Sequence, residues 1–172
     1  MRRLRAIAAE VAVLDGEIEA LIELAAPANL LAVPGVGPLV AAKLLGETRG
    51  VGRFSSAAAF AAHAGVAPLP ASSGTTSRHR LNRGGNRQLN RALFTIAMVQ
   101  ARWDPRACEY LARKRGEGKS AAEARRCLKR HLASVVYRAM REDARVANQR
   151  HEPRLEQLVA DLTERARAPF LT

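Results

Sequence analysis

The chain has 172 residues, with 28 Lys or Arg against 16 Asp or Glu, which gives a formal charge of +12. This length suits one domain with appendages, and an apolar content of 48% excludes a chain that is disordered throughout. The charge indicates a polyanionic partner, and no apolar run approaches the roughly 20 residues of a membrane span. The basic start lacks the apolar core of a signal peptide, so we expect a cytoplasmic protein that binds nucleic acid and no membrane.

The N-terminal segment 2–25 is predicted to be a coiled-coil helix that ends before Pro27. Its apolar residues recur at alternating spacings of three and four, at Leu4, Ile7, Val11, Leu14, Ile18 and Leu21. The same seam fits a helix that packs on its own domain. A homo-oligomer formed through the coil is therefore one of two open interpretations.

Segment 30–45 has the pattern of a helix-hairpin-helix motif, in which two short helices flank a tight turn. Glycines at Gly35 and Gly37, with Val36 between them, let the backbone approach a phosphate, and the next helix points its N-terminal amides at that phosphate. Lys43 adds a charge-assisted contact. Such contacts recognise the DNA backbone rather than the base sequence. A turn used only for packing is the alternative.

A loop is expected over 46–54, and then Ser55 or Ser56 caps a short helix that ends near Ala64. From Gly65 to Gly85 the sequence has no sustained period, so we expect a long functional loop, with or without a short hairpin. A basic run begins within this loop and continues beyond it. Its arginines are predicted to contact phosphate rather than form only a solvated charged face, with His79 assisting: Arg78, Arg80, Arg83, Arg87 and Arg91.

The C-terminal half is expected to be a bundle of about three to four helices. Asn86 caps the first, to about Arg102, with Leu89, Leu93, Ile96 and Ala97 inward. Asp104 and Pro105 start the second, which ends near Gly116. A third runs from Ser120 to about Arg141 and turns basic residues largely outward, at Arg125, Arg126, Lys129 and Arg130. A separate amphipathic helix is expected within 150–172. Cys108 and Cys127 are expected to be reduced core thiols.

The predicted fold class is thus mainly α: an N-terminal coiled-coil helix, a helix-hairpin-helix module, a long loop and a C-terminal bundle. The expected units are 1–27, the coil; 28–145, the main domain; and 146–172, a tail that is part helical.

The order of several short motifs resembles the C-terminal domain of the insertion-sequence 110 (116/902) family of transposases, over about residues 3–142. The motifs are Val33-Pro34-Gly35-Val36-Gly37-Pro38, Arg53-Phe54-Ser55-Ser56, Ala61-Ala62-His63-Ala64-Gly65-Val66-Ala67-Pro68, Ser73-Gly74 and Arg83-Gly84-Gly85-Asn86. The resemblance implies a DNA recombinase whose N-terminal RNase-H-like domain carries an acidic metal site. It also implies a serine nucleophile that forms a covalent link to DNA, and in some members a structured guide RNA.

The resemblance places that nucleophile at Ser73, with Ser72 as the fallback; taken alone, a serine in a loop is usually a turn residue. Thr75 and Asn90 stand where the family commonly has basic residues, which weakens the expected phosphate contacts. We expect no acidic metal domain before the coil in this chain. We therefore expect a truncated transposase or isolated C-terminal domain that binds DNA, holds no metal or cofactor itself, and catalyses recombination only with the Mg²⁺-dependent N-terminal domain.

Two other functions fit parts of the pattern. A non-catalytic helix-hairpin-helix nucleic-acid-binding protein would need the hairpin and the basic run but not Ser73. A structural adaptor that assembles through its helices would show little salt-sensitive DNA affinity.

Overall fold

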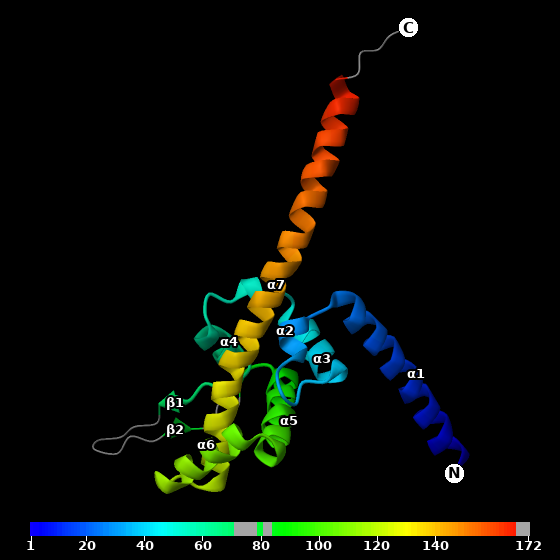
Figure 1. Ribbon diagram of the computed structural model, residues 1–172. Helices are drawn as coiled ribbons and strands as arrows, with labels where there is room; N and C mark the ends of the chain where they lie inside the picture. The colour runs from blue at the N-terminus through cyan, green and yellow to red at the C-terminus, as the bar shows by residue number, and fades with distance from the viewer. Residues whose placement is uncertain (71–78, 81–83, 168–172) are drawn as a thin grey trace.

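The computed structural model describes residues 1–70, 79–80 and 84–167, and for residues 69–70, 79–80 and 150–167 it describes the backbone. The fold is mainly α-helical, as predicted (Figure 1). The elements are α1 (Arg2–Ala25), α2 (Ala28–Leu31), α3 (Pro38–Thr48), the 3₁₀ helix η1 (Val51–Arg53), α4 (Ala57–His63), β1 (Leu69–Pro70), β2 (His79–Arg80), α5 (Arg87–Trp103), α6 (Pro105–Gly116) and α7 (Ala121–Arg167).

Helix α1 has the bounds that the sequence predicts and extends away from the body in Figure 1. It ends where Ala26 adopts a left-handed conformation (φ 44°) and Pro27 follows. Most of its apolar seam faces solvent, at Leu4, Ile7, Val11, Leu14 and Leu21. Near its C-terminal end, Ile22 is buried in the core and Ile18 packs against it. The helix is therefore confirmed, whereas its coiled-coil pairing stays a prediction.

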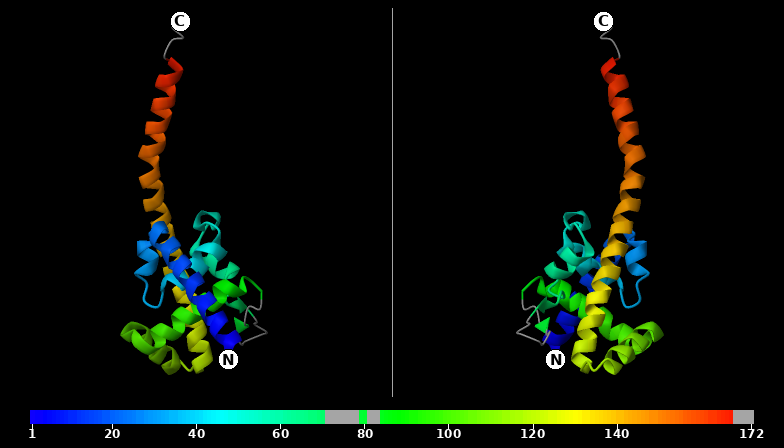
Figure 2. Two further views of the ribbon diagram at one scale, coloured as in Figure 1. Left: turned by 90° about the vertical axis from the view of Figure 1, so that its right-hand side faces the viewer. Right: turned by 90° about the vertical axis from the view of Figure 1, so that its left-hand side faces the viewer.

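The core forms where α7 packs against α2, η1, α4, α5 and α6 (Figures 1 and 2). Helix α5 buries the face that its period predicts: Leu89, Leu93, Ile96 and Ala97. The opposing residues of α7 are also largely as predicted, since Ala124, Leu128 and Leu132 are buried, and Val135 packs partly buried against the core.

Side chains of α7 also fix the first half of the chain. The Tyr137 hydroxyl donates a hydrogen bond to the Phe54 carbonyl oxygen at 3.0 Å, and the Phe60 ring packs edge-on to that of Phe54. The Asp143 carboxylate accepts from the backbone N–H groups of Asn29 and Leu30, each at 2.9 Å. Because α2 begins after Pro27, which has no capping side chain, this distant carboxylate supplies the cap and holds α2 on α7.

The predicted helix caps are confirmed. Asn86 Oδ1 accepts from Gln88 N at 2.8 Å and Leu89 N at 3.0 Å, and Asp104 Oδ1 accepts from Arg106 N at 3.0 Å. Ser56, rather than Ser55, caps α4 by accepting from Ala59 N at 3.1 Å. These contacts are local in sequence, so side-chain type and position are enough to predict them.

Three other predictions are wrong. Helix α3 continues through Gly46, because Leu44 and Thr48 are buried on either side and their packing outweighs the roughly 1 kcal/mol cost of a helical glycine. A single helix, α7, replaces the two separate helices that were expected on either side of a break after Arg141. Residues 142–149 contain neither Gly nor Pro, and the Glu142–Arg145 ion pair (2.6 Å) supports the helix there. Both cysteines are free thiols, but Cys108 is exposed and Cys127 is half-buried, so neither belongs to the buried core.

Candidate nucleic-acid interface

The turn between α2 and α3 is built from residues with distinct roles. Gly35 has φ +85°, a conformation that glycine adopts without strain. Val36 is buried and its N–H donates to the Val33 carbonyl oxygen at 3.0 Å, which closes the turn. Gly37 is exposed at the N-cap position of α3, where it provides no side-chain cap to the first helical turn. Pro38, the first residue of α3, has no N–H, so the first-turn amides without a helical partner are those of Leu39 and Val40, which follow an open glycine.

The two glycines differ in what surrounds them. A Cβ atom on Gly35 would lie 3.2 Å from Val99 Cβ, whereas one on Gly37 would meet nothing within 4 Å. The Gln100 side chain of α5 also donates to the Pro34 carbonyl oxygen at 2.7 Å. Gly35 therefore lets the turn pack against α5, and Gly37 leaves the start of α3 open.

Helix α3 connects this turn to the start of α5. The turn contacts the C-terminal half of α5 through Val99 and Gln100. At the other end of α3, Glu47 Oε2 accepts from Asn86 Nδ2 at 2.6 Å. The two helices thus run side by side in opposite directions. The predicted phosphate ligand Lys43 lies between these ends, on the exposed side of α3.

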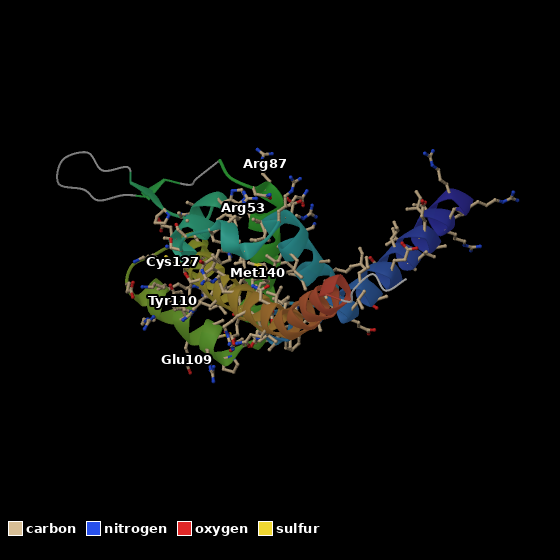
Figure 3. All side chains as sticks on the ribbon, turned by 90° about the horizontal axis from the view of Figure 1, so that it is seen from above. Arg53, Arg87, Glu109, Tyr110, Cys127 and Met140 are labelled. Atoms are coloured by element: carbon tan, nitrogen blue, oxygen red, sulfur yellow. The ribbon has the colours of Figure 1, made fainter. Side chains whose placement is uncertain are left out.

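Two predicted arginines, Arg87 and Arg91, are exposed on the first turns of α5, four residues apart and so on one face. In Figure 3, Arg53 lies on the same side of the molecule as Arg87, and Glu109 lies on the opposite side. Arg53 belongs to the Arg53-Phe54-Ser55-Ser56 motif but was not predicted as a DNA contact, because it is the only basic residue of that motif. Its guanidinium carbon lies 4.9 Å from the Phe54 ring centroid. The basic surface of the described residues therefore includes α5 and η1.

The other predicted site residues are not described at side-chain level. Arg80 belongs to β2, whose backbone alone is described, and Arg78, Arg83, Ser72 and Ser73 lie outside the described residues. Strand β1 pairs antiparallel with β2 in the register Leu69↔Arg80 and Pro70↔His79. The described residues that flank both serines in the sequence, Pro70 and His79, are therefore opposite each other.

Two glycines bring the ends of the long loop together at the body. Gly65 has φ +67°, and a Cβ there would clash with the Gly84 carbonyl oxygen. Gly85 has φ +90°, and its Cβ would lie 2.6 Å from both Gly65 N and His63 O. The Asn86 N–H donates to His63 O at 2.7 Å. The loop is thus closed at its base by main-chain contacts that leave no room for side chains.

Asn90 and Lys129 support this closure. Asn90 Nδ2 donates to the carbonyl oxygens of Ala64 and Gly65, both at 3.1 Å, and Lys129 Nζ donates to Asn90 Oδ1 at 2.8 Å. Lys129 was expected to face outward; instead it reaches α5, and burial lowers the pKa of its ammonium group below the usual value, with Arg126 adding to the effect. Asn90 therefore positions the base of the loop.

Among the described residues, no three His, Cys, Asp or Glu side chains gather as a metal site. No described helix is both long and apolar enough to cross a membrane.

Comparison with known proteins gives the family. Residues 28–112 match the model of the Transposase IS116/IS110/IS902 family. The chain is 39% identical over 132 residues to the 43.6 kDa protein of insertion element IS110 from Streptomyces coelicolor, covering 75% of this chain and 32% of that protein. It is 36% identical over 148 residues to the 42 kDa protein of insertion element IS900 from Mycobacterium paratuberculosis, covering 80% of this chain and 37% of the relative. The chain thus spans about a third of the length of these relatives. Through this shared region, the chain belongs to the IS116/IS110/IS902 family of transposases.

Proposed function

We propose that this chain is the DNA-binding, serine-bearing C-terminal part of an insertion-sequence transposase, and that it grips the DNA backbone. The observation that carries the binding proposal is the open glycine turn at the start of α3, where Gly37 leaves the first helical amides without a side-chain cap. Amides and helix dipole together favour a phosphate at such a position. Lys43 and the exposed arginines at the other end of α3 extend the positive surface, and the net charge of +12 supports the same partner.

Binding to duplex or branched DNA is expected to weaken steeply as salt rises, with slight sequence preference. If about five phosphates are neutralised, the affinity falls about 100- to 1,000-fold between about 50 and about 200 mM salt, because condensed counterions are released on binding. Fluorescence anisotropy of labelled duplexes measures this slope. An affinity that does not change with salt would contradict the proposal and favour the structural adaptor.

Replacing Gly37 by valine is expected to weaken DNA binding about 10- to 100-fold, because the new side chain blocks charge-assisted contacts between the α3 amides and a phosphate. The backbone at Gly37 is extended (φ −93°, ψ 178°) and open, so valine fits without strain. Gly35→Val should weaken binding too, but it would also clash with Val99 and is the less selective test.

Gly46→Val is the matched control, since it places the same side chain in open space on the same helix. Circular dichroism establishes that the helices persist in each variant. If folded Gly37→Val binds DNA as tightly as the unchanged protein does, the turn serves packing alone.

The catalytic part of the proposal rests on family membership and the Ser73-Gly74 motif. The hydroxyl oxygen of Ser73, with Ser72 as the alternative, attacks a DNA phosphorus and forms a bond to it while the bond from that phosphorus to the oxygen of one strand end breaks. The serine proton passes to the activating group, and the released strand end takes up a proton and leaves as a free hydroxyl. A serine hydroxyl needs a base or metal to activate it, and we place that activation in a Mg²⁺-dependent RNase-H-like domain of the complete transposase. Arg78, Arg80 and Arg83 supply positive charge for the transferring phosphoryl group. A structured guide RNA is a further candidate partner.

We propose in addition that α1 pairs with a second copy of itself. Its heptad residues are exposed along most of the helix, and burying such a seam against a partner helix is favourable.

A further inference from the structure

Trp103 is a large apolar side chain that the fold leaves in solvent, at the C-terminal end of α5. Its exposed fraction is 73%, and it is the only tryptophan of the chain. We propose that the Trp103 ring is a stacking platform for an unpaired base of the DNA strand that the neighbouring turn holds. This inference rests on the proposed DNA binding and adds a second kind of contact, to a base rather than to a phosphate.

Trp103 lies beside the turn between α2 and α3. Val99 and Gln100 contact the turn at Gly35 and Pro34, respectively. Trp103 follows these two residues by four and three positions on the same helix, so it lies one helical turn farther along the same face. A strand whose phosphate is held at the start of α3 therefore passes close to the Trp103 ring.

The charged groups near the Trp103 ring include arginines. The Arg102 guanidinium carbon lies 5.2 Å from the Trp103 ring centroid, and both Arg102 and Arg106 are exposed. Within the described ranges, the ion pairs engage other cations: Lys114, Lys119, Arg126 and Arg145. Asp104 is the nearest acid in sequence, and its carboxylate accepts the Arg106 N–H as the cap of α6. The ring therefore contacts one cation, Arg102, and neither Arg102 nor the exposed Arg106, three residues after the ring, has an acidic ion-pair partner among the described residues.

This combination favours an unpaired base over an apolar protein surface. Covering Trp103 with an apolar partner would remove water from the Arg102 guanidinium group without compensation, whereas a nucleic-acid strand offers a base to the ring and a phosphate to that arginine. The base has to be unpaired, because bases inside a duplex already stack on one another and do not present a free face.

The test compares a blunt duplex with the same duplex extended by a single-stranded overhang. Because Trp103 is the sole tryptophan, its emission reports directly on this site. We expect the overhang duplex to quench that emission strongly and the blunt duplex to quench it weakly. Trp103→Ala should reduce the affinity for the overhang duplex about 5- to 100-fold, while changing the affinity for the blunt duplex less than about threefold.

Matched variants separate stacking from other effects. Trp103→Phe keeps a ring and should retain most of the preference for the overhang, whereas Trp103→Leu keeps only apolar bulk and should lose it. Phe94→Ala removes another exposed ring of α5 and should leave the preference unchanged.

The proposal is overturned if anisotropy shows that the overhang duplex binds while Trp103 emission stays constant. Equal overhang affinity for Trp103→Ala and the unchanged protein also overturns it. Either result leaves the phosphate grip standing, because blunt-duplex binding is measured in parallel. Failure to bind any of the duplexes overturns both proposals. If Trp103 emission changes with protein concentration in the absence of DNA, the ring lies in a contact between copies of the chain. That result also overturns the stacking role.

Discussion

Replacing Gly65 by alanine is expected to lower the free energy of unfolding by about 2–5 kcal/mol. The left-handed φ of +67° costs an alanine about 1–2 kcal/mol, and forcing a methyl group against the Gly84 carbonyl oxygen adds about 1–3 kcal/mol. Asn90 holds the Gly65 carbonyl oxygen at 3.1 Å, which limits how far the backbone can move away. Urea denaturation followed by circular dichroism measures the change.

Gly118→Ala separates these two contributions. Gly118 has a similar positive φ, +82°, in the turn that ends α6, where Lys119 N donates to Lys114 O, but a Cβ there meets nothing within 4 Å. It should therefore lower the free energy of unfolding by only about 1–2 kcal/mol. If Gly65→Ala costs no more than Gly118→Ala, the main-chain contacts at the base of the loop yield easily, and the close approach of Gly65 to Gly85 does not hold the loop.

Ser73→Ala is expected to abolish a covalent protein–DNA adduct while leaving DNA affinity within about a factor of ten, since a hydroxyl contributes only about 0.5–1.5 kcal/mol as a hydrogen-bond partner. The adduct should form when the chain is joined behind a compatible RNase-H-like domain, with magnesium and any required guide RNA. The 172-residue chain alone should form none that a denaturing gel with labelled DNA detects, because a serine hydroxyl is a weak nucleophile without activation.

Ser72→Ala is the matched control on the same gel. An adduct that persists in Ser73→Ala and disappears in Ser72→Ala moves the nucleophile by one residue. An adduct that survives both changes shows that neither serine is the nucleophile. Salt-sensitive DNA binding with no adduct under any of these conditions favours the non-catalytic helix-hairpin-helix protein.

Local patterns predict much of this fold correctly. The features predicted correctly each depend on residues within one or two helical turns of one another. They are the caps at Asn86 and Asp104, the start of α6 at Pro105 and the buried face of α5. Turn glycines and helix periodicity are likewise visible in a single sequence. The order of short motifs that resembles the transposase family agrees with the match over residues 28–112.

Contacts between distant residues could not be predicted in this way. The Asn90–Lys129 hydrogen bond joins residues 39 positions apart, and the Asp143 cap of α2 joins residues more than 110 apart. Nothing in the local sequence of Lys129 distinguishes it from a solvated lysine. The exposure of Trp103 was equally hidden, since a tryptophan at the end of an amphipathic helix fits a core position as well as an exposed one.

The closed base of the long loop has a consequence for protein engineering. Contacts among residues 63–65 and 84–86 join the two ends of the loop through main-chain atoms, so we expect the helical body to keep its fold when the segment between Pro70 and His79 is replaced. Each doubling of a flexible loop costs only about 0.6 kcal/mol in closure entropy. We therefore expect segments of other lengths and sequences to be accepted at this position, provided that Gly65 and Gly85 are kept.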